Sequence, residues 1–490
     1  MSIRLAAQFA PWPTFNYFCS VQRTFLGNLF VLQALNWLIK PVWIFFIEVA
    51  VQNSLGDALY GKYYAVFGLA LLFNILLDFG LNNYTATSVA THPEKPVPPG
   101  LLRLRLSLAA LYVATTFVFG WVQQMDLRLL GLIILNQVLA GFTLYYRAVL
   151  QGRHRFKTDS VASVIDRLVA ILLLSWLILG KGIQGENGLF LFLLAQTVGY
   201  AVSLFFSFFT SKTQSPQIGE EETIHGARLL GSMKWFAVLA LCMAVFTRID
   251  TQMLMHLAPG GEAEVGQYAR SFRFLDAVLI FSSLISSQLL PLFSRMISRD
   301  ESTDGLIWLT VRIISFVALP LMFAGWFFGG ALMGLFYHKQ SNADDAGIFA
   351  WLMGCFFPMA LIHIFGTWLT AAGQLKKLGL LALGCVVFNA ALNVFLIPAK
   401  GAYGASVAGC ATQTVFVMIC MLWVMSSGGF EFKISRNVLI LLATAVAFAL
   451  FYGISLKMPG LTGFILSCGL WTFAGSFMFV PEWKKWLRRG

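Results

Sequence analysis

The sequence has few charged residues for its length. Only 11% of its 490 residues are Asp, Glu, Lys or Arg, whereas a soluble domain has about 25%. Hydrophobic residues make up 58% of the chain, so a soluble globular domain is excluded. No polar stretch is long enough to form a catalytic domain outside the membrane, which argues against an enzyme. The composition is that of a polytopic membrane protein.

Cysteine is also scarce. The seven cysteines are an odd number, and most lie within apolar runs, which argues against a disulfide framework and against a zinc site. We therefore expect no metal site and no catalytic residues. The first residues lack a long apolar core before a small-residue cleavage site, so we do not expect a signal peptide.

Apolar runs of about 20 residues recur along the chain, and each could cross a hydrocarbon core of about 30 Å. We expect an all-α membrane protein with about fourteen transmembrane helices. Their approximate ranges are 26–51, 60–82, 103–123, 128–150, 158–180, 187–210, 235–257, 264–291, 305–336, 346–371, 376–397, 403–426, 437–456 and 460–481.

The net charge of +12 comes from basic residues that gather in alternate connections. Arg103 and Arg105, for example, lie near an even-numbered connection, whereas Lys62 is alone in its odd-numbered one. This alternation indicates membrane topology rather than binding to nucleic acid. By the positive-inside rule, both termini and the 211–234 connection are cytoplasmic.

Some basic residues lie within the apolar runs, where topology does not explain them. An ionisable side chain at bilayer depth is costly and usually functional. The segment 247–276 is the richest in such charges. The intramembrane basic residues are Lys40, Arg147, Arg167, Arg248, Arg270, Arg273 and Arg312.

Two interpretations compete for the arginines of segment 247–276. Arg273 could pair with Asp276, which lies three residues further along the same helix face. Arg270 and Arg273 would repel each other unless an anion or a carboxylate lay between them, which favours a binding role. Arg248 and Asp250 are two residues apart and should face different sides of their helix.

The other basic residues also have alternative roles. Arg167 is deep in its span, and we expect its neighbour Asp166 to face elsewhere. Arg147 is about one turn from the cytoplasmic face and could simply extend to lipid phosphates. Lys40 precedes Pro41, which should kink the first helix, and Arg312 is shallow enough for a structural role.

Several carboxylates also lie at membrane depth. They could bind a coupling proton or sodium ion, although pairing with basic residues is the simpler role. These carboxylates are Glu48, Asp78, Asp166, Asp250 and Asp276.

The chain contains signs of an internal duplication. Tyr60-Gly61-Lys62-Tyr63 opens the second span, and Val265-Gly266-Gln267-Tyr268 opens the eighth in the corresponding place. Repeats of six spans would be related by an axis along the membrane normal, with substrate between them. We expect the following parts: 1–25, a cytoplasmic or interfacial segment; 26–210, the first lobe; 211–234, a connection; 235–426, the second lobe; 437–481, two accessory spans; and 482–490, a basic tail.

The sequence resembles polysaccharide-type flippases of the multidrug/oligosaccharidyl-lipid/polysaccharide exporter (MOP) superfamily, the Wzx-like O-antigen transporters. The resemblance rests on the order of Asn53-Ser54-Leu55-Gly56, the two motifs above and Asp250. The segment from Leu380 to Ala405, with Asn389, Asn393, Pro398 and Gly404, also looks like the eleventh and twelfth helices of this family.

The resemblance implies two six-helix lobes in a V shape, alternating access, and a cationic cavity in a bacterial inner membrane. The cargo would be a lipid-linked oligosaccharide for surface polysaccharide such as lipopolysaccharide O-antigen. The cavity residues would be Lys40, Arg147, Arg167, Arg248, Arg270 and Arg273. Membrane lipids, a polysaccharide polymerase and assembly proteins would be partners, and no cofactor is implied beyond a proton or sodium gradient. A lipid II flippase and a cation-coupled drug antiporter of the same superfamily stay open as alternatives.

Overall fold

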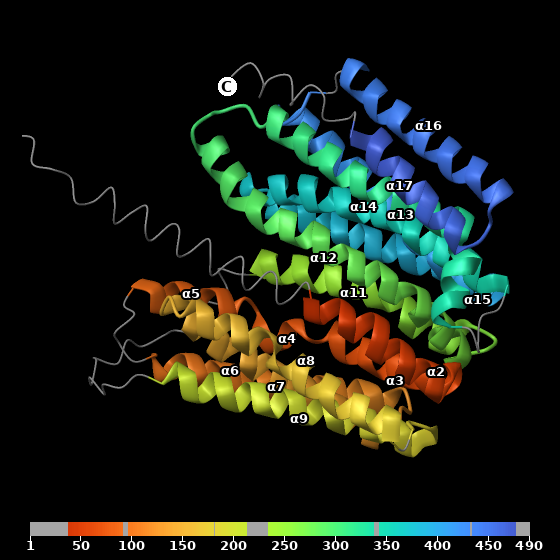
Figure 1. Cartoon of the computed structure of the whole chain (residues 1–490). Helices are drawn as coiled ribbons and strands as arrows, with labels where there is room; N and C mark the ends of the chain where they lie inside the picture. The colour runs from red at the N-terminus through yellow and green to blue at the C-terminus, as the bar shows by residue number, and fades with distance from the viewer. Residues whose placement is uncertain are drawn as a thin grey trace, which may run out of the picture.

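The computed structural model describes residues 38–91, 97–180, 182–212, 234–337, 343–431 and 434–476. These residues are built of helices and contain no β-strand. The helices run side by side in two groups, and α11 and α12 lie where the groups meet (Figure 1).

The N-terminal group begins with α-helical residues 38–42, and further helical segments follow up to residue 211. They are η1 (Trp43–Glu48), α2 (Val49–Leu55), α3 (Asp57–Leu72), α4 (Ile75–Asp78), α5 (Leu81–Thr91), α6 (Pro99–Val122), α7 (Leu127–Gly152), α8 (Phe156–Gly180) and α9 (Gly185–Ser211).

The C-terminal group is built from long helices. They are α11 (Lys234–Leu257), α12 (Glu262–Ser298), α13 (Asp304–Phe336), α14 (Ala343–Ala371) and α15 (Leu375–Ser426). Two further helices, α16 (Ile434–Lys457) and α17 (Leu461–Ser476), lie beside α13 (Figure 1). The residues Phe328, Phe451 and Trp471 pack together between them.

The number of spans agrees with the prediction from hydropathy. Eleven described helical stretches are long and apolar enough to cross a membrane. One of them, α15, has 52 residues and is broken at Gly401, whose φ is 50°, so it contains both runs expected at 376–397 and 403–426. Counting its two arms separately and adding the shorter α16 and α17 confirms the expected all-α fold of about fourteen spans.

The first described span departs from α-helical geometry two residues after Pro41, where we expected a kink. Residues Trp43–Glu48 form a π-helix, in which residues five apart lie one above the other. The indole nitrogen of Trp43 consequently donates to Oε1 of Glu48 at 2.8 Å. Glu48 is thereby held where the two groups of helices meet.

The second span is interrupted, which hydropathy did not predict. Helix α3 ends at Leu72, and Phe79 and Gly80 have positive φ values of 46° and 84°. Asp78 lies at this interruption, where its Oδ1 accepts from the backbone N–H of Asn82 at 3.0 Å. It also lies 3.5 Å from Arg105, so Asp78 is an ion-pair partner.

Arg105 corrects one assignment made from the sequence. We counted it with the basic residues of a cytoplasmic connection, but it lies within α6 and its side chain is only 1% exposed. Its guanidinium donates to the backbone carbonyls of Leu77 and Gly141. The interrupted helix leaves carbonyls without helical partners, and Arg105 supplies a donor there.

Candidate functional site

The two groups of helices meet most closely where α3 crosses α12. A Cβ atom on Gly61 would lie 1.7 Å from the carbonyl oxygen of Glu262, and one on Gly266 would lie 2.1 Å from that of Asp57. Only glycine allows so close an approach of two backbones. Gln52 adds a hydrogen bond to the carbonyl of Gly266 at 2.8 Å. We call this contact the α3–α12 junction.

The junction is reciprocal. Gly61 contacts Glu262, which lies four residues before Gly266. In the same way, Gly266 contacts Asp57, which lies four residues before Gly61. The two motifs matched as a repeat in the sequence are thus brought together in space.

Arg270 is enclosed beside this junction. Its side chain is fully buried and lies 3.1 Å from both Asp57 of α3 and Asp345 of α14. These carboxylates offset the repulsion between Arg270 and Arg273. From the sequence, either an external anion or a carboxylate was expected to do so. The predicted contact of Arg270 with substrate would require the junction to open, and Asp57 and Asp345 were not among the residues predicted from the sequence.

Arg273 does not form the intrahelical pair with Asp276 that was one alternative. Its guanidinium lies 3.4 Å from Glu48 and 4.2 Å from the ring centre of Tyr60. Both partners come from the N-terminal group, so Arg273 joins the two groups of helices.

Arg248 takes Asp276 as its own partner. The two side chains are 3.3 Å apart, and Arg248 also donates to the hydroxyl of Tyr64 at 2.8 Å. The side chain of Asp276 is 40% exposed. Among the ion pairs of the junction, this pair is therefore the most accessible to a ligand.

Asp250 faces away from Arg248, as predicted. It is buried, and it accepts hydrogen bonds from Tyr268 at 3.1 Å and from Asn393 at 2.6 Å. Asn393 also donates to Asn389 at 3.0 Å. Among the described residues no basic side chain lies within 4 Å of this carboxylate, so Asp250 is held by neutral donors.

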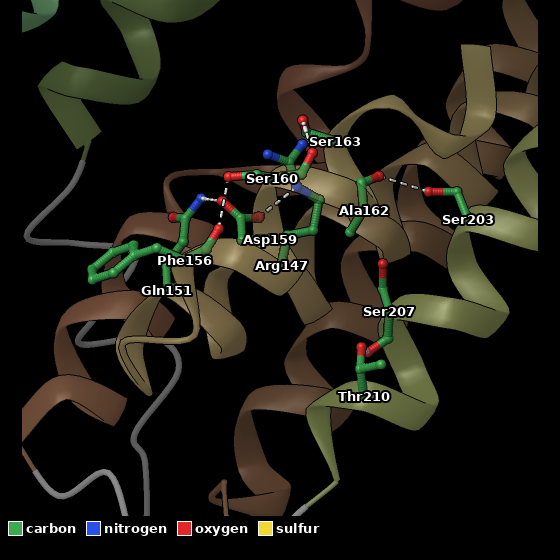
Figure 2. A network of polar contacts seen from close by, with 10 residues as sticks. All are labelled: Arg147, Gln151, Phe156, Asp159, Ser160, Ala162, Ser163, Ser203, Ser207 and Thr210. Atoms are coloured by element: carbon green, nitrogen blue, oxygen red, sulfur yellow. Dashed lines mark hydrogen bonds and ion pairs between the residues drawn. The ribbon is translucent and has the colours of Figure 1, made fainter. Parts of the chain in front are cut away.

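Arg147 is held within the protein, so the alternative in which it extends to lipid phosphates is wrong for this structure. Its Nε lies 2.7 Å from Asp159 of α8, and Gln151 donates to the same carboxylate at 2.9 Å. Figure 2 shows these three side chains converging between α7 and α8. Ser203 of α9 binds the carbonyl of Ala162 at 3.1 Å, which ties α9 to α8 in the same view (Figure 2).

Arg167 and Lys40 are the more accessible of the three predicted cavity residues in the N-terminal group. The Arg167 side chain is 33% exposed and lies over the ring of Trp43 at 4.9 Å. Asp166 lies 3.5 Å from it, so our expectation that Asp166 faces elsewhere is wrong. Lys40 is partly exposed and lies in the field of Arg167 and Arg147.

The six predicted cavity residues thus fall into two sets. Lys40, Arg147 and Arg167 belong to the N-terminal group, whereas Arg248, Arg270 and Arg273 lie along the junction. Glu48 connects the sets because it pairs with Arg273 and its charge acts on both Arg167 and Asp276. Every one of the five arginines has a carboxylate within 4 Å, so the predicted excess of positive charge is largely balanced in this conformation.

A further ion pair lies at the junction end, outside this network. Lys62 is 3.0 Å from Asp126, which also accepts from the backbone N–H groups of Arg128 and Leu129 at the start of α7. Burial would raise the pKa of Asp126, but the ammonium of Lys62 and these two N–H groups together hold it below its usual value.

Solved structures with the same fold are transport proteins. The chain is similar to the lipid II flippase MurJ in an inward closed conformation, with a TM-score of 0.69, 13% identity, and coverage of 92% of this chain and 99% of that chain. It is also similar to a multidrug resistance MATE family transporter, with 14% identity to both an inward-facing and an outward-facing structure. The inward-facing structure gives a TM-score of 0.62 over 79% of this chain and 94% of that chain. The outward-facing structure gives 0.56 over 81% and 96%.

These likenesses show the fold: a helical membrane protein fold shared with that lipid II flippase and with transporters whose structures are described as members of the MOP superfamily. Comparison with curated protein sequences gives no match. Residues 26–297, more than half of the chain, match the family described as polysaccharide biosynthesis protein. The chain therefore belongs to the polysaccharide biosynthesis protein family.

Proposed function

We propose that this protein is a flippase for a polyprenyl-pyrophosphate-linked oligosaccharide. It would move this lipid from the cytoplasmic to the outer leaflet by alternating access, for the synthesis of surface polysaccharide such as O-antigen. The protein would be located in the bacterial inner membrane, with both termini in the cytoplasm. The supporting observation is that Lys40 and Arg167, which we expect at membrane depth, are partly exposed cations of the N-terminal group, next to Glu48, which pairs with Arg273 of the junction.

The chemistry of this cargo requires such cations. A pyrophosphate cannot cross hydrocarbon without partners, because burying an unpaired charge is very costly. Arginine binds phosphate oxygens with two parallel hydrogen bonds, whereas lysine acts as a point charge. Lys40, Arg167 and, through exchange of their carboxylate partners, Arg147 and Arg248 would bind the phosphates. Arg270 and Arg273 would become available only when the α3–α12 junction opens.

Asp250 is the residue we propose for coupling to a proton or sodium gradient. It is a buried carboxylate held by the neutral donors Tyr268 and Asn393, so a proton or a cation could neutralise it without breaking an ion pair. The Asp250→Asn variant should lose any dependence of transport on an imposed gradient.

A translocation assay tests the proposed function. Purified protein in liposomes should move labelled undecaprenyl-pyrophosphate-linked oligosaccharide across the bilayer. The Lys40→Gln, Arg167→Gln double variant should be at least roughly tenfold slower, since each lost charge-assisted bond removes about 1.5–3 kcal/mol. Arg128→Gln, which changes an exposed arginine, is the matched control. A folded double variant with the wild-type rate would refute the assignment.

The same vesicles separate the alternatives. Lipid II flipping is the second candidate because MurJ, whose structure covers 92% of the chain, is a lipid II flippase. Transport of lipid II but not of the oligosaccharide lipid would favour that activity, and transport of cationic drugs alone would favour an antiporter. Neighbouring genes for glycosyltransferases and a polysaccharide polymerase would support the surface-polysaccharide assignment.

A further inference from the structure

Five of the six residues that line a groove between α12 and α14 are neutral and polar, although more of its exposed lining surface is apolar than polar. Its volume is about 350 Å³, and none of its described lining residues carries a permanent charge. Ser283 lies thirteen residues after Arg270, about 20 Å along α12, so the groove is at the end away from the α3–α12 junction. The lining residues are Ser283, Ser286, Leu290, His363, Thr367 and Thr370.

The hydroxyl protons of this groove are already used within the protein. Thr367 donates to the carbonyl of His363 at 2.5 Å, and Thr370 donates to that of Gly366 at 2.8 Å. Ser286 and Thr367 are 2.6 Å apart. Because the Thr367 proton goes to its own helix, Ser286 must be the donor of that bond.

The Ser283 hydroxyl likewise donates to the carbonyl of Ile280, at 2.8 Å. A hydroxyl oxygen that donates its proton still has lone pairs that can accept. The groove therefore offers mainly hydrogen-bond acceptors to a ligand, and the neutral imidazole of His363 adds one donor and one acceptor.

This set of groups selects for one kind of ligand. Acceptors without a cation would repel a phosphate, and a lipid chain would leave the remaining lone pairs of these oxygens without a donor. A molecule with many hydroxyl groups can instead donate to the serine and threonine oxygens. His363, Thr367 and Thr370 are four and three residues apart, so they lie on one face of α14 and present a continuous row.

The groove also lies close enough to the Arg248–Asp276 ion pair for one ligand to contact both. Ser283 is seven residues after Asp276, which places it two turns, or about 10 Å, further along the same face of α12. Asp276 pairs with Arg248 at 3.3 Å. A ligand with an anionic part and a hydroxylated part could therefore contact both regions at once.

We propose that the groove between α12 and α14 binds the hydroxyl groups of the glycan, while the basic residues bind its phosphates. This inference rests on the proposed function, since it assigns a subsite to that substrate. It adds that the glycan is recognised by the C-terminal group of helices, through neutral acceptors rather than through charge.

Two purified lipid probes separate the two parts of the substrate. They are undecaprenyl pyrophosphate and undecaprenyl-pyrophosphate-linked N-acetylglucosamine, and their affinities are measured for the full chain in lipid nanodiscs. The wild type should bind the glycosylated lipid several-fold more tightly. In the Ser286→Ala, Thr367→Val double variant, that affinity should fall about threefold to tenfold per lost contact. Its affinity for the bare lipid should change by less than about twofold, the size of a minor surface effect.

The double variant is chosen because removing both partners of a hydrogen bond is nearly neutral for folding. Thr370→Val is a second variant with the same expected direction. Thr115→Val is the matched control, since Thr115 is a half-buried α6 threonine, outside the groove, whose hydroxyl donates to its own helix, at 2.7 Å from the carbonyl of Leu111. Melting temperatures identify any variant that fails to fold.

Each result decides the question. Retention of the wild-type preference by folded groove variants, or equal loss of affinity for both probes, would overturn the glycan site. Equal binding of both probes by the wild type would also overturn it while leaving the proposed function standing. If the wild type binds neither probe, the proposed function itself fails.

Discussion

Substitution of Gly61 should open the α3–α12 junction. In Gly61→Ala, the new Cβ would lie 1.7 Å from the carbonyl oxygen of Glu262, whereas ordinary contact begins at 3.4 Å. The two helices must therefore separate by about 1.7 Å, the difference between these values. Such overpacking costs about 1–3 kcal/mol, and loss of the Gln52 to Gly266 bond costs about 1 more. The equilibrium should shift toward the form open at this end by roughly 30- to 700-fold.

Distance measurements between spin labels at Glu186 and Leu257 would detect this shift. Both residues lie near the junction end, one in each group of helices. The labels require a background without the native cysteines. The distribution should move to longer distances in Gly61→Ala and stay unchanged in Gly131→Ala, where a Cβ has no atom within 4 Å. A distribution in Gly61→Ala that matches the wild type would show that the junction does not hold this end closed.

Three further predictions concern stability and topology. Arg270→Ala should lose about 3–5 kcal/mol of stability, because its two carboxylate partners would be left facing each other; a melting temperature equal to that of Arg128→Ala would contradict this. Asp126→Ala should lose about 1 kcal/mol at pH 7, and Asp126→Asn less, since asparagine keeps the cap. The folded-state pKa of Asp126 is lowered, so its contribution to stability is present above the unfolded value of about 3.9 and is lost as the pH falls below that value. If wild type and Asp126→Ala still differ in their free energy of unfolding at that lower pH, the ion pair is not the cause. Ser215→Cys should react with an impermeant thiol reagent only after cells are opened, and labelling of intact cells would overturn the predicted topology.

Hydropathy and helical periodicity were sufficient for the fold and for part of the site. They predicted the spans and the opposite orientations of Arg248 and Asp250. These properties depend on one helix at a time. The motifs that contain Gly61 and Gly266 were matched as a repeat, but their contact was not predicted.

The ion-pair partners could not be predicted in the same way. Arg273 pairs with Glu48 and Arg270 with Asp57, and more than 200 residues separate the members of each pair. Such pairs form only when helices from different parts of the chain pack together. Arg105 was misplaced because its depth depends on the interruption of the second span, which hydropathy does not reveal.

The reciprocal contact at the α3–α12 junction has the form of an isologous interface between two identical subunits. In a homodimer of single repeats, every substitution would occur on both sides of the axis at once. In one continuous chain a substitution occurs on one side only, so the two groups of helices can differ in sequence while Gly61 and Gly266 are both kept. Lys62 and Gln267 occupy equivalent places beside the two glycines, yet only Lys62 carries a charge, which pairs with Asp126. At the α3–α12 junction a reciprocal contact thus joins two groups of helices with different chemistry.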